Sequence, residues 1–385
     1  MRTLRFVHCA DIHLDAPFRE QGSDKYSETR REDIKKALLN IIKEVRESNA
    51  DLLLISGDLY EHQYVARRTM DWLHMVLSEA KVPVILLPGN HDPYLRNSWY
   101  RAWDWPSNVH ILSNENPHLI LDKLGVNLYG IGFSAFKEGK PDFSLVPEPM
   151  KDYFNILMLH GTLDMDFTQH EYMPVASSEL KALNYDYYAL GHFHSIKQDY
   201  NIINPGNPEP LGFDEPGAHG AFFVTLSNDG EKTQVETRFF ETATRAYHDK
   251  TLDITGCKTL DEVRIRILEI TEGLDSQRDL VRVTLKGRTE LNIDPKTLNQ
   301  MFSHWLYFKI RDNTGAAFDL DSLEKDPSLK GAFVREIRKR LDSLEKELIA
   351  NPDNEEIKMG IERLNLALFF GLEALKSGKI EWWGE

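Results

Sequence analysis

The sequence predicts an α/β layered domain over residues 1–235, a smaller α+β domain over residues 236–322 and a C-terminal helical segment over residues 323–385. Three observations support this division. Strand and helix patterns alternate in the first part, the periodicity changes after about residue 235, and apolar residues recur at helical spacing in the last part. The chain of 385 residues is also longer than one ordinary domain.

The strands of the first domain are short apolar runs that end abruptly in glycine and polar residues. Nearly continuous apolar character is typical of strands buried on both faces of a sheet. We expect these strands at residues 4–10, 51–56, 82–87, 154–159, 185–190 and 221–226. Helical spacing of apolar residues predicts amphipathic crossover helices around residues 34–45 and 70–77.

The rest of the chain predicts a second domain with strands at 234–240 and 280–285 and a helix at 260–270. In the tail, two apolar stripes at helical spacing are separated by Asn351-Pro352-Asp353, which ends the first helix. The two helices can bury each other as a hairpin, or they can offer an apolar surface to a partner. Both alternatives stay open.

Composition limits the classes of function. The net charge of −15, from 46 basic and 61 acidic residues, argues against a protein that grips nucleic acid through a global positive field. A nuclease is still compatible with this charge, because bound divalent cations supply local positive charge.

Cys9 and Cys257 are expected to be reduced core residues. No apolar stretch reaches membrane-spanning length, so we expect a cytoplasmic protein that does not enter a membrane.

Polar motifs follow the first three strands of the predicted domain. Asp11-Ile12-His13 places a carboxylate and an imidazole two residues apart, on the same side of an extended chain, where both can bind one metal. In Gly57-Asp58 the glycine allows close backbone approach, and the carboxylate can bridge two cations. Gly89-Asn90-His91-Asp92 packs three potential ligands into consecutive positions after a turn.

Two further motifs follow later strands, His160-Gly161 and Gly191-His192-Phe193-His194. Open α/β sheets place their active sites at such strand ends, so we expect one dinuclear metal site. Imidazole, carboxylate and amide ligands without thiolate suit Mn²⁺, Fe²⁺ or Zn²⁺, with Mn²⁺ as the first choice. Two such ions about 4 Å apart can clamp a phosphodiester and lower the pKa of a water, which indicates a two-metal phosphoesterase.

The five motifs in this order resemble the calcineurin-like metallophosphoesterase superfamily. Asp11-Ile12-His13-Leu14 and Gly57-Asp58-Leu59-Tyr60 are most similar to its DNA repair exonuclease branch, the SbcD/YhaO-like group. This resemblance implies a four-layer α/β/β/α sandwich, an α+β capping domain and a C-terminal helical hairpin. It also implies that the hairpin docks on an SbcC-like or YhaN-like coiled-coil ATPase, and that the protein forms a homodimer.

The resemblance also assigns roles to residues. Asp58 would bridge two metals, with His91 facing the scissile phosphate and Asp92 orienting and charging the His91 ring. The alternative role for Asp92 is to stabilise its turn. Related nucleases often carry a functional histidine shortly after the Gly-Asp motif, and His62 is the candidate here. The other implied ligands are Asp11, His13 and His194 for the first metal and Asn90, His160 and His192 for the second.

Three functions are compatible with these residues. The leading hypothesis is a manganese-dependent DNA nuclease, acting as an exonuclease in double-strand-break repair together with an ATPase. A small-molecule phosphodiesterase or phosphomonoesterase would use the same ligands on another substrate. A non-catalytic scaffold subunit would keep the metals only to stabilise its fold.

Overall fold

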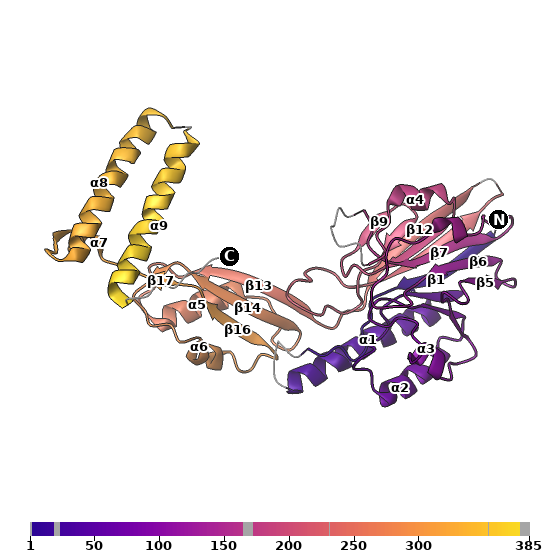
Figure 1. Ribbon diagram of the computed structural model, residues 1–385. Coiled ribbons are helices and arrows are strands. Elements are labelled where there is room, and N and C mark those ends of the chain that lie inside the picture. Colours follow the sequence, from indigo (N-terminus) through magenta and orange to yellow (C-terminus); the bar gives the residue numbers. More distant parts are fainter. Residues whose placement is uncertain (1, 19–23, 165–171, 231, 353, 378–385) are drawn as a thin grey trace. The chain divides into compact units, whose positions relative to one another are not determined.

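The computed structural model describes residues 2–18, 24–164, 172–230, 232–352 and 354–377 (Figure 1). The chain divides into two compact units. The first comprises residues 1–248 with 275–280, and the second comprises residues 249–274 with 281–385. Residues 378–385, the end of the predicted helical segment, lie outside the described residues.

The first unit contains two six-stranded sheets. The first sheet has the order β12-β11-β1-β2-β3-β4, in which β1 to β4 run parallel and β11 pairs antiparallel with both β1 and β12. Its strands are β1 (Arg2–Cys9), β2 (Leu52–Ser56), β3 (Val84–Leu87), β4 (Val109–Ile111), β11 (Gly220–Asn228) and β12 (Thr233–Glu241).

The second sheet has the order β5-β6-β7-β8-β10-β9. Its four inner strands run parallel, and the edge strands β5 and β9 are antiparallel to their neighbours. Its strands are β5 (His118–Leu121), β6 (Val126–Ile131), β7 (Phe154–His160), β8 (Tyr187–Gly191), β9 (Lys197–Asp199) and β10 (Ile202–Asn204).

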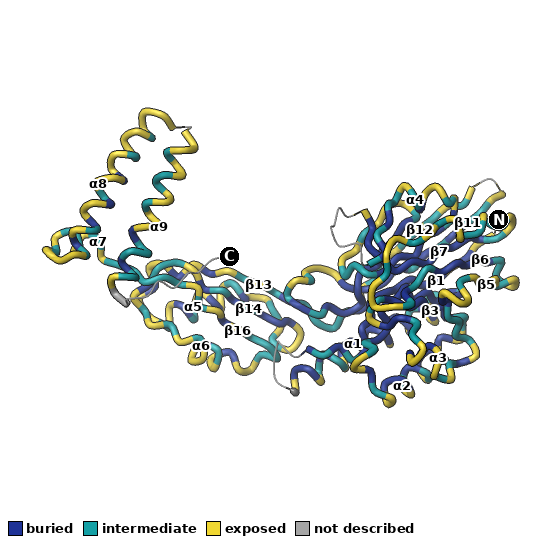
Figure 2. The backbone as a smooth tube through the Cα atoms, viewed as in Figure 1, coloured by how far each residue is buried: buried dark blue, intermediate teal, exposed yellow. Residues whose placement is uncertain are grey.

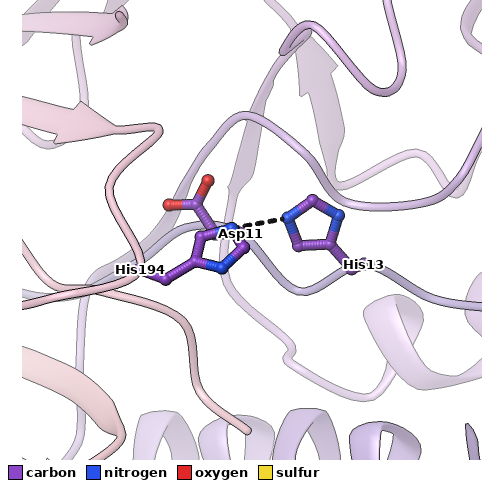
Figure 3. Close-up of side chains that lie close together, drawn as sticks. All are labelled: Asp11, His13 and His194. Atoms are coloured by element: carbon purple, nitrogen blue, oxygen red, sulfur yellow. Dashed lines mark hydrogen bonds between the residues drawn. The ribbon is translucent and has the colours of Figure 1, made fainter. Parts of the chain in front are cut away.

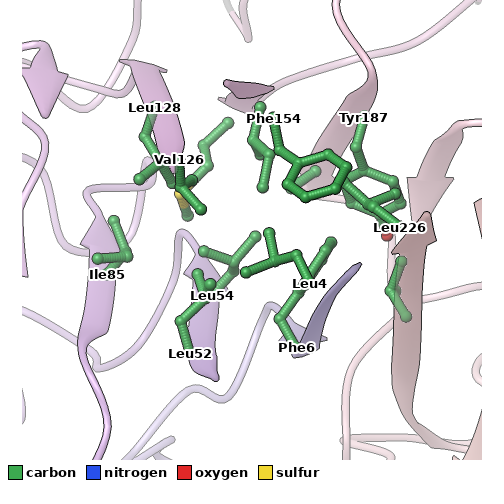
Figure 4. Packing of buried hydrophobic residues seen from close by; sticks show 14 of the residues in the cluster. Leu4, Phe6, Leu52, Leu54, Ile85, Val126, Leu128, Phe154, Tyr187 and Leu226 are labelled. Carbon is green, nitrogen blue, oxygen red and sulfur yellow. The ribbon is translucent and has the colours of Figure 1, made fainter. Parts of the chain in front are cut away.

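The main core lies between the two sheets (Figure 4). Alternation along β2 directs Leu52 and Leu54 into this core, where they meet residues of the second sheet such as Val126 and Phe154. Helices α1 (Asp24–Glu47) and α2 (Arg67–Ser78) bury their apolar stripes beside the first sheet. Helix α4 (Ser177–Ala182) packs Leu180 on the outer face of the second sheet. These layers form the expected α/β/β/α sandwich, with short α3 (Trp99–Ala102) and η1 (Phe143–Leu145) in its loops.

The second unit is built on a three-stranded sheet with the order β13-β14-β16. Its core contains Val263 and Ile267 of the helix α5 together with alternate residues of the strands. The elements are β13 (Ala246–Asp253), which begins in the first unit, α5 (Leu260–Ile270), β14 (Asp279–Lys286), β15 (Arg288–Thr289), α6 (Pro295–Met301), β16 (Phe308–Asp312) and β17 (Gly315–Ala316).

The helical segment comprises α7 (Leu320–Lys325), α8 (Leu329–Ala350) and α9 (Glu355–Ser377). Helices α8 and α9 pack on each other through a small core that contains Val334 and Leu368. Most of their remaining surface is exposed (Figure 2). A Cβ atom on Gly371 would lie 2.3 Å from the Phe333 ring, so a glycine permits this close packing. The self-packed hairpin is therefore formed, and apolar residues outside its core remain exposed.

The six strands predicted for the first domain are confirmed to within two residues at each end. The boundary of that domain differs from the prediction, because β12 pairs along its length with β11 and the first unit continues to residue 248. The α+β part and the helical segment also fall in one unit. Among the described residues no helix is long and apolar enough to cross a membrane, and the cytoplasmic location stays a prediction.

Candidate metal centre

The five motifs come together because each follows a strand of one of the two facing sheets. Strands β1, β2 and β3 are neighbours in the first sheet, and β7 and β8 are neighbours in the second. Within each sheet these strands run parallel to one another, so their carboxyl ends lie at the same edge of that sheet. The candidate ligands lie in the loops that begin there or, for His160, at the last residue of β7.

The first ligand group contains Asp11, His13 and His194, whose ligand atoms lie within 4.8 Å of one another (Figure 3). The Nε2 atoms of the two histidines are 3.1 Å apart. The backbone of Asp11 and His13 is held by hydrogen bonds from their N–H groups to the carbonyls of Gly57 and Asp58, at 3.0 and 2.9 Å. These two loop segments are thus fixed to each other.

Asp11 and His13 do not lie on an extended strand, contrary to what the sequence predicted. Strand β1 ends at Cys9, and the two residues have φ values of 53° and 54°, in the left-handed region. Alternation along an extended strand therefore does not bring them together. Asp58, at φ 52°, shares this conformation. Strained backbone of this kind costs of order 1–3 kcal/mol per residue and is concentrated at functional sites.

The second ligand group contains Asn90, His160 and His192. The Oδ1 atom of Asn90 lies 3.1 Å from His160 Nε2 and 3.1 Å from His192 Nδ1. Asp58 lies between the two groups, because its Oδ2 atom is 3.3 Å from His160 Nε2 and 3.7 Å from His13 Nε2. The structure brings all seven predicted ligands into one cluster, with Asp58 in the bridging position.

Glycine at position 57 is required by this packing. Gly57 has a φ of +93°, and a Cβ atom there would lie 2.1 Å from Nδ1 of His160. Gly191 has a similar role, since its Cβ would lie 2.0 Å from the carbonyl oxygen of Ser56. The close backbone approach predicted for the Gly-Asp motif therefore serves to admit the imidazole of His160.

The donor set fits a pair of divalent metals. His13 Nδ1 lies 2.9 Å from Glu61, His194 Nδ1 lies 2.5 Å from Glu215, and His160 Nδ1 lies 2.8 Å from the carbonyl of Ser56. When each Nδ1–H donates to these oxygens, the Nε2 lone pairs of His13 and His194 face each other. Two ligands about 2.1 Å from one ion lie roughly 3.0–3.4 Å apart, which agrees with the observed 3.1 Å.

The electrostatics of the metal-free cluster favour protons on two of the ligands. Burial lowers the pKa of His160, but the charges of Asp58 and Asp11 and the hydrogen bonds to Asp58 and Ser56 together raise it to about 9. Burial likewise lowers the pKa of His194, while its hydrogen bond to Glu215 and the charges of Asp11, Glu215 and Asp58 together raise it to about 9. Burial and the charge of His160 lower the pKa of His192 to about 3. A metal must displace protons from His160 and His194.

His91 lies beside the cluster and remains accessible. Its side chain is 45% exposed, and its ring packs edge-on against His13 at 4.8 Å between centroids. Its Nδ1 atom is 3.0 Å from Oε2 of Glu61. Burial lowers the pKa of His91, but the hydrogen bond to Glu61 and the charge of Asp58 raise it to about 9. His91 can therefore carry a proton next to the ligands.

The carboxylate of Asp92 makes its hydrogen bonds to backbone groups and to Tyr100, and these contacts do not support the predicted role of orienting the His91 ring. It accepts hydrogen bonds from the backbone N–H groups of Gly89 at 2.6 Å and Leu59 at 2.7 Å, and from the Tyr100 hydroxyl at 2.7 Å. Asp92 is fully buried. Its charge still contributes to raising the pKa of His91, but the alternative role as a turn-stabilising carboxylate matches these contacts.

His62 is not brought into either ligand group. Its backbone N–H donates to the carbonyl of His91 at 3.0 Å, and its ring packs against Phe136 at 5.9 Å. Among the described residues its Nδ1 atom has no hydrogen-bond partner, and burial lowers its pKa. A role for His62 stays a prediction.

The sequence motifs do not point to two further residues that contact the predicted ligands. Glu61 and Glu215 support the first-metal histidines, and each lies next to a recognisable local pattern, after Gly57-Asp58 and before Pro216-Gly217. Each is distant in sequence from its partner. The only signal in the sequence was an acidic residue close to a motif, which specifies no contact.

Sequence comparisons identify a family and a relative of this chain. A model of the calcineurin-like phosphoesterase family matches residues 4–195. The uncharacterized metallophosphoesterase YhaO of Bacillus subtilis strain 168 is 30% identical over 241 residues, which cover 58% of this chain and 58% of that protein. The chain thus spans less than two thirds of the length of this relative.

Two solved structures are also similar. TT1561 of Thermus thermophilus is 13% identical with a TM-score of 0.35, covering 61% of this chain and 98% of that one. A dimetal phosphatase from Danio rerio is 15% identical with a TM-score of 0.35, covering 62% of this chain and 97% of that one.

Proposed function

Residues 4–195 make this chain a member of the calcineurin-like phosphoesterase family, and from this premise we propose that it is a two-metal DNA nuclease. The family and the similarity to a metallophosphoesterase support a metal-dependent phosphoester hydrolase. The proposal adds the substrate, DNA, and the reaction, phosphodiester hydrolysis by an exonuclease in DNA repair.

One observation carries the hydrolytic chemistry: seven ligands converge with Asp58 between two groups, and His91 lies beside them. Asp11, His13 and His194 would hold the first metal, and Asn90, His160 and His192 would hold the second. Bound metals would supply Lewis acidity, lowering the pKa of a water and offsetting charge on the phosphoryl oxygens. The mixed donors favour Mn²⁺, with Fe²⁺ or Zn²⁺ as alternatives.

The contribution of His91 follows from its position. Its ring is 45% exposed, so a phosphate can approach it, and its Nδ1 is held by Glu61 at 3.0 Å. The other ring nitrogen, Nε2, is then the atom that can donate a proton to the leaving oxygen of the ester. Donation by His91 would release that oxygen as an alcohol.

Space for a substrate larger than phosphate lies beside the first-metal ligand His194. A cavity of about 460 Å³ is lined there by His194, Ile196, Asp214 and Glu215, among others. A cavity of this size accepts a nucleotide unit. Its acidic lining gives no general attraction for DNA, so the proposed grip on the backbone depends on bound metals and on a partner.

The proposed partner is an SbcC-like or YhaN-like coiled-coil ATPase that docks on the C-terminal helices. Helix α8 exposes Leu329 at 72% and Ile349 at 81%, and α9 exposes Met359 and Leu366 at 47% each. These apolar side chains lie outside the core that joins the two helices. A homodimer is proposed from the family resemblance alone.

The test uses purified protein and a His91→Ala variant. Each is incubated with end-labelled duplex DNA, single-stranded DNA and bis-p-nitrophenyl phosphate, with and without Mn²⁺. We expect Mn²⁺-dependent shortening of DNA from its ends, reduced at least about tenfold in His91→Ala. Intact DNA with hydrolysis of the small ester would refute the nuclease and favour a small-molecule phosphodiesterase. No cleavage at all, with binding of a coiled-coil ATPase retained, would favour a scaffold.

A further inference from the structure

One carboxylate, that of Glu61, contacts two histidines of different function. Its Oε1 atom is 2.9 Å from His13 Nδ1, and its Oε2 atom is 3.0 Å from His91 Nδ1. The Glu61 side chain is 13% exposed, so water competes weakly for these hydrogen bonds. Each oxygen therefore accepts from one imidazole.

The backbone around Glu61 is tied to the same two loops. Its N–H donates to the carbonyl of Leu14 at 3.0 Å, and the neighbouring Tyr60 forms a parallel bridge with Leu14. The next N–H, that of His62, donates to the carbonyl of His91 at 3.0 Å. The carboxylate is thus held between the segment that carries His13 and the segment that carries His91.

Neither Asp92 nor a third metal ion accounts for the position of the His91 ring as well as Glu61 does. Asp92, beside His91 in sequence, uses its carboxylate on backbone N–H groups and Tyr100. The ligand atoms of His13, Glu61 and His91 lie close enough to hold an ion. However, His13 would then bind metals through both ring nitrogens, whereas one Glu61 oxygen within hydrogen-bond distance of each Nδ1 accounts for both contacts without an ion.

We propose that Glu61 is a positioning residue that orients His13 toward the first metal and His91 toward the scissile phosphate through one shared carboxylate. The role at His91 rests on the phosphodiesterase function proposed above. By holding both Nδ1–H groups, Glu61 leaves Nε2 of His13 for the metal and Nε2 of His91 for the substrate. Placement of the two imidazoles is therefore coupled.

The test is a double-mutant cycle with Glu61→Gln and His91→Ala, using DNA and bis-p-nitrophenyl phosphate at saturating Mn²⁺. Glutamine keeps the shape but has one oxygen, so it cannot accept from both histidines. We expect Glu61→Gln to lower kcat by about 10–100-fold in the wild-type background and by less than about threefold in His91→Ala. Glu47→Gln, an exposed position on α1, is the control and should leave kcat unchanged.

A second readout does not depend on hydrolysis. In Zn²⁺-loaded protein, the ring Nδ1–H of His91 should give a downfield proton resonance, assigned by its loss in His91→Ala and absent in Glu61→Ala, which removes both acceptor oxygens. Equal losses of kcat in both backgrounds, or persistence of that resonance in Glu61→Ala, would overturn the proposal. Three metals per chain, falling to two in Glu61→Gln, would overturn it in favour of a third ion. If the wild-type protein cleaves only the small ester, DNA is refuted as the substrate. The double-mutant cycle measured on that ester still decides the role of Glu61.

Discussion

The side chain of Asp92 holds the backbone of Asp58: its carboxylate accepts hydrogen bonds from the N–H of Asp58 at 3.2 Å and from the N–H of Leu59 at 2.7 Å. Asp92 also accepts from Gly89, so it joins the loops after β2 and β3. Asp58, the proposed bridging ligand, is thus positioned by the buried carboxylate of Asp92.

Asp92→Ala should therefore destabilise the protein and disrupt the metal site together. Several buried N–H groups and the Tyr100 hydroxyl would lose their acceptor, and we expect the free energy of unfolding to fall by about 3 kcal/mol or more. Urea unfolding with a spectroscopic probe measures the change. Asp71→Ala, at an exposed position on α2, is the control and should change stability by less than about 0.5 kcal/mol. Equal stability of the two variants would contradict the assigned contacts.

Glu215→Gln should weaken binding of the first metal. Glu215 accepts from His194 Nδ1 at 2.5 Å and is itself held by Asn207 and the N–H of Leu211, both at 2.7 Å. Loss of such a support reduces metal affinity by about 10–100-fold. Calorimetric titration with Mn²⁺ measures the dissociation constants. Asp214→Asn, the exposed neighbour, should bind as the wild type does, and a similar loss there would point to charge rather than to the hydrogen bond.

Metal affinity should rise with pH up to about 9. His160 and His194 have pKa values raised to about 9 in the metal-free protein, so below that pH each carries a proton that the metal displaces. Above it neither proton remains, and the affinity should level off. Titration of anaerobic Mn²⁺ at several pH values, in buffers of different ionisation enthalpy, measures affinity and proton release. Binding that is independent of pH between about 6.5 and 9 would contradict these pKa shifts.

The part of this site that the sequence predicts is the part encoded locally. Each ligand motif follows a buried apolar strand, and parallel strands bring such ends to one edge of a sheet, so Asp58 after β2 and Asn90 after β3 could be placed together without a structure. The two glutamates that support the histidine ligands could not be predicted in this way. Glu61 meets His13 across 48 residues, and Glu215 meets His194 across 21, through loops that have no periodic pattern.

The difference between local sequence patterns and contacts distant in sequence also explains where the predicted fold departs from the structure. The strands predicted correctly are nearly continuous apolar runs that are buried, whereas the edge strands β5 and β9 are partly exposed and carry no such pattern. The extended geometry assumed for Asp11 and His13 failed because tertiary contacts to Gly57 and Asp58 hold them in the left-handed region.

Gly57→Ala should abolish binding at the second metal while leaving the protein folded. A methyl group there would lie 2.1 Å from His160 Nδ1, and the φ of +93° is unfavourable for alanine, so the imidazole must move away from Asn90 and Asp58. Gly256→Ala is the control that tests the effect of a positive φ without the steric contact. Gly256 has a φ of +84°, and no atom lies within 4 Å of its added Cβ. Metal content after dialysis, with circular dichroism as the check on folding, should show about one metal lost in Gly57→Ala and none in Gly256→Ala. Two metals retained by Gly57→Ala would mean that His160 is not a ligand in this position.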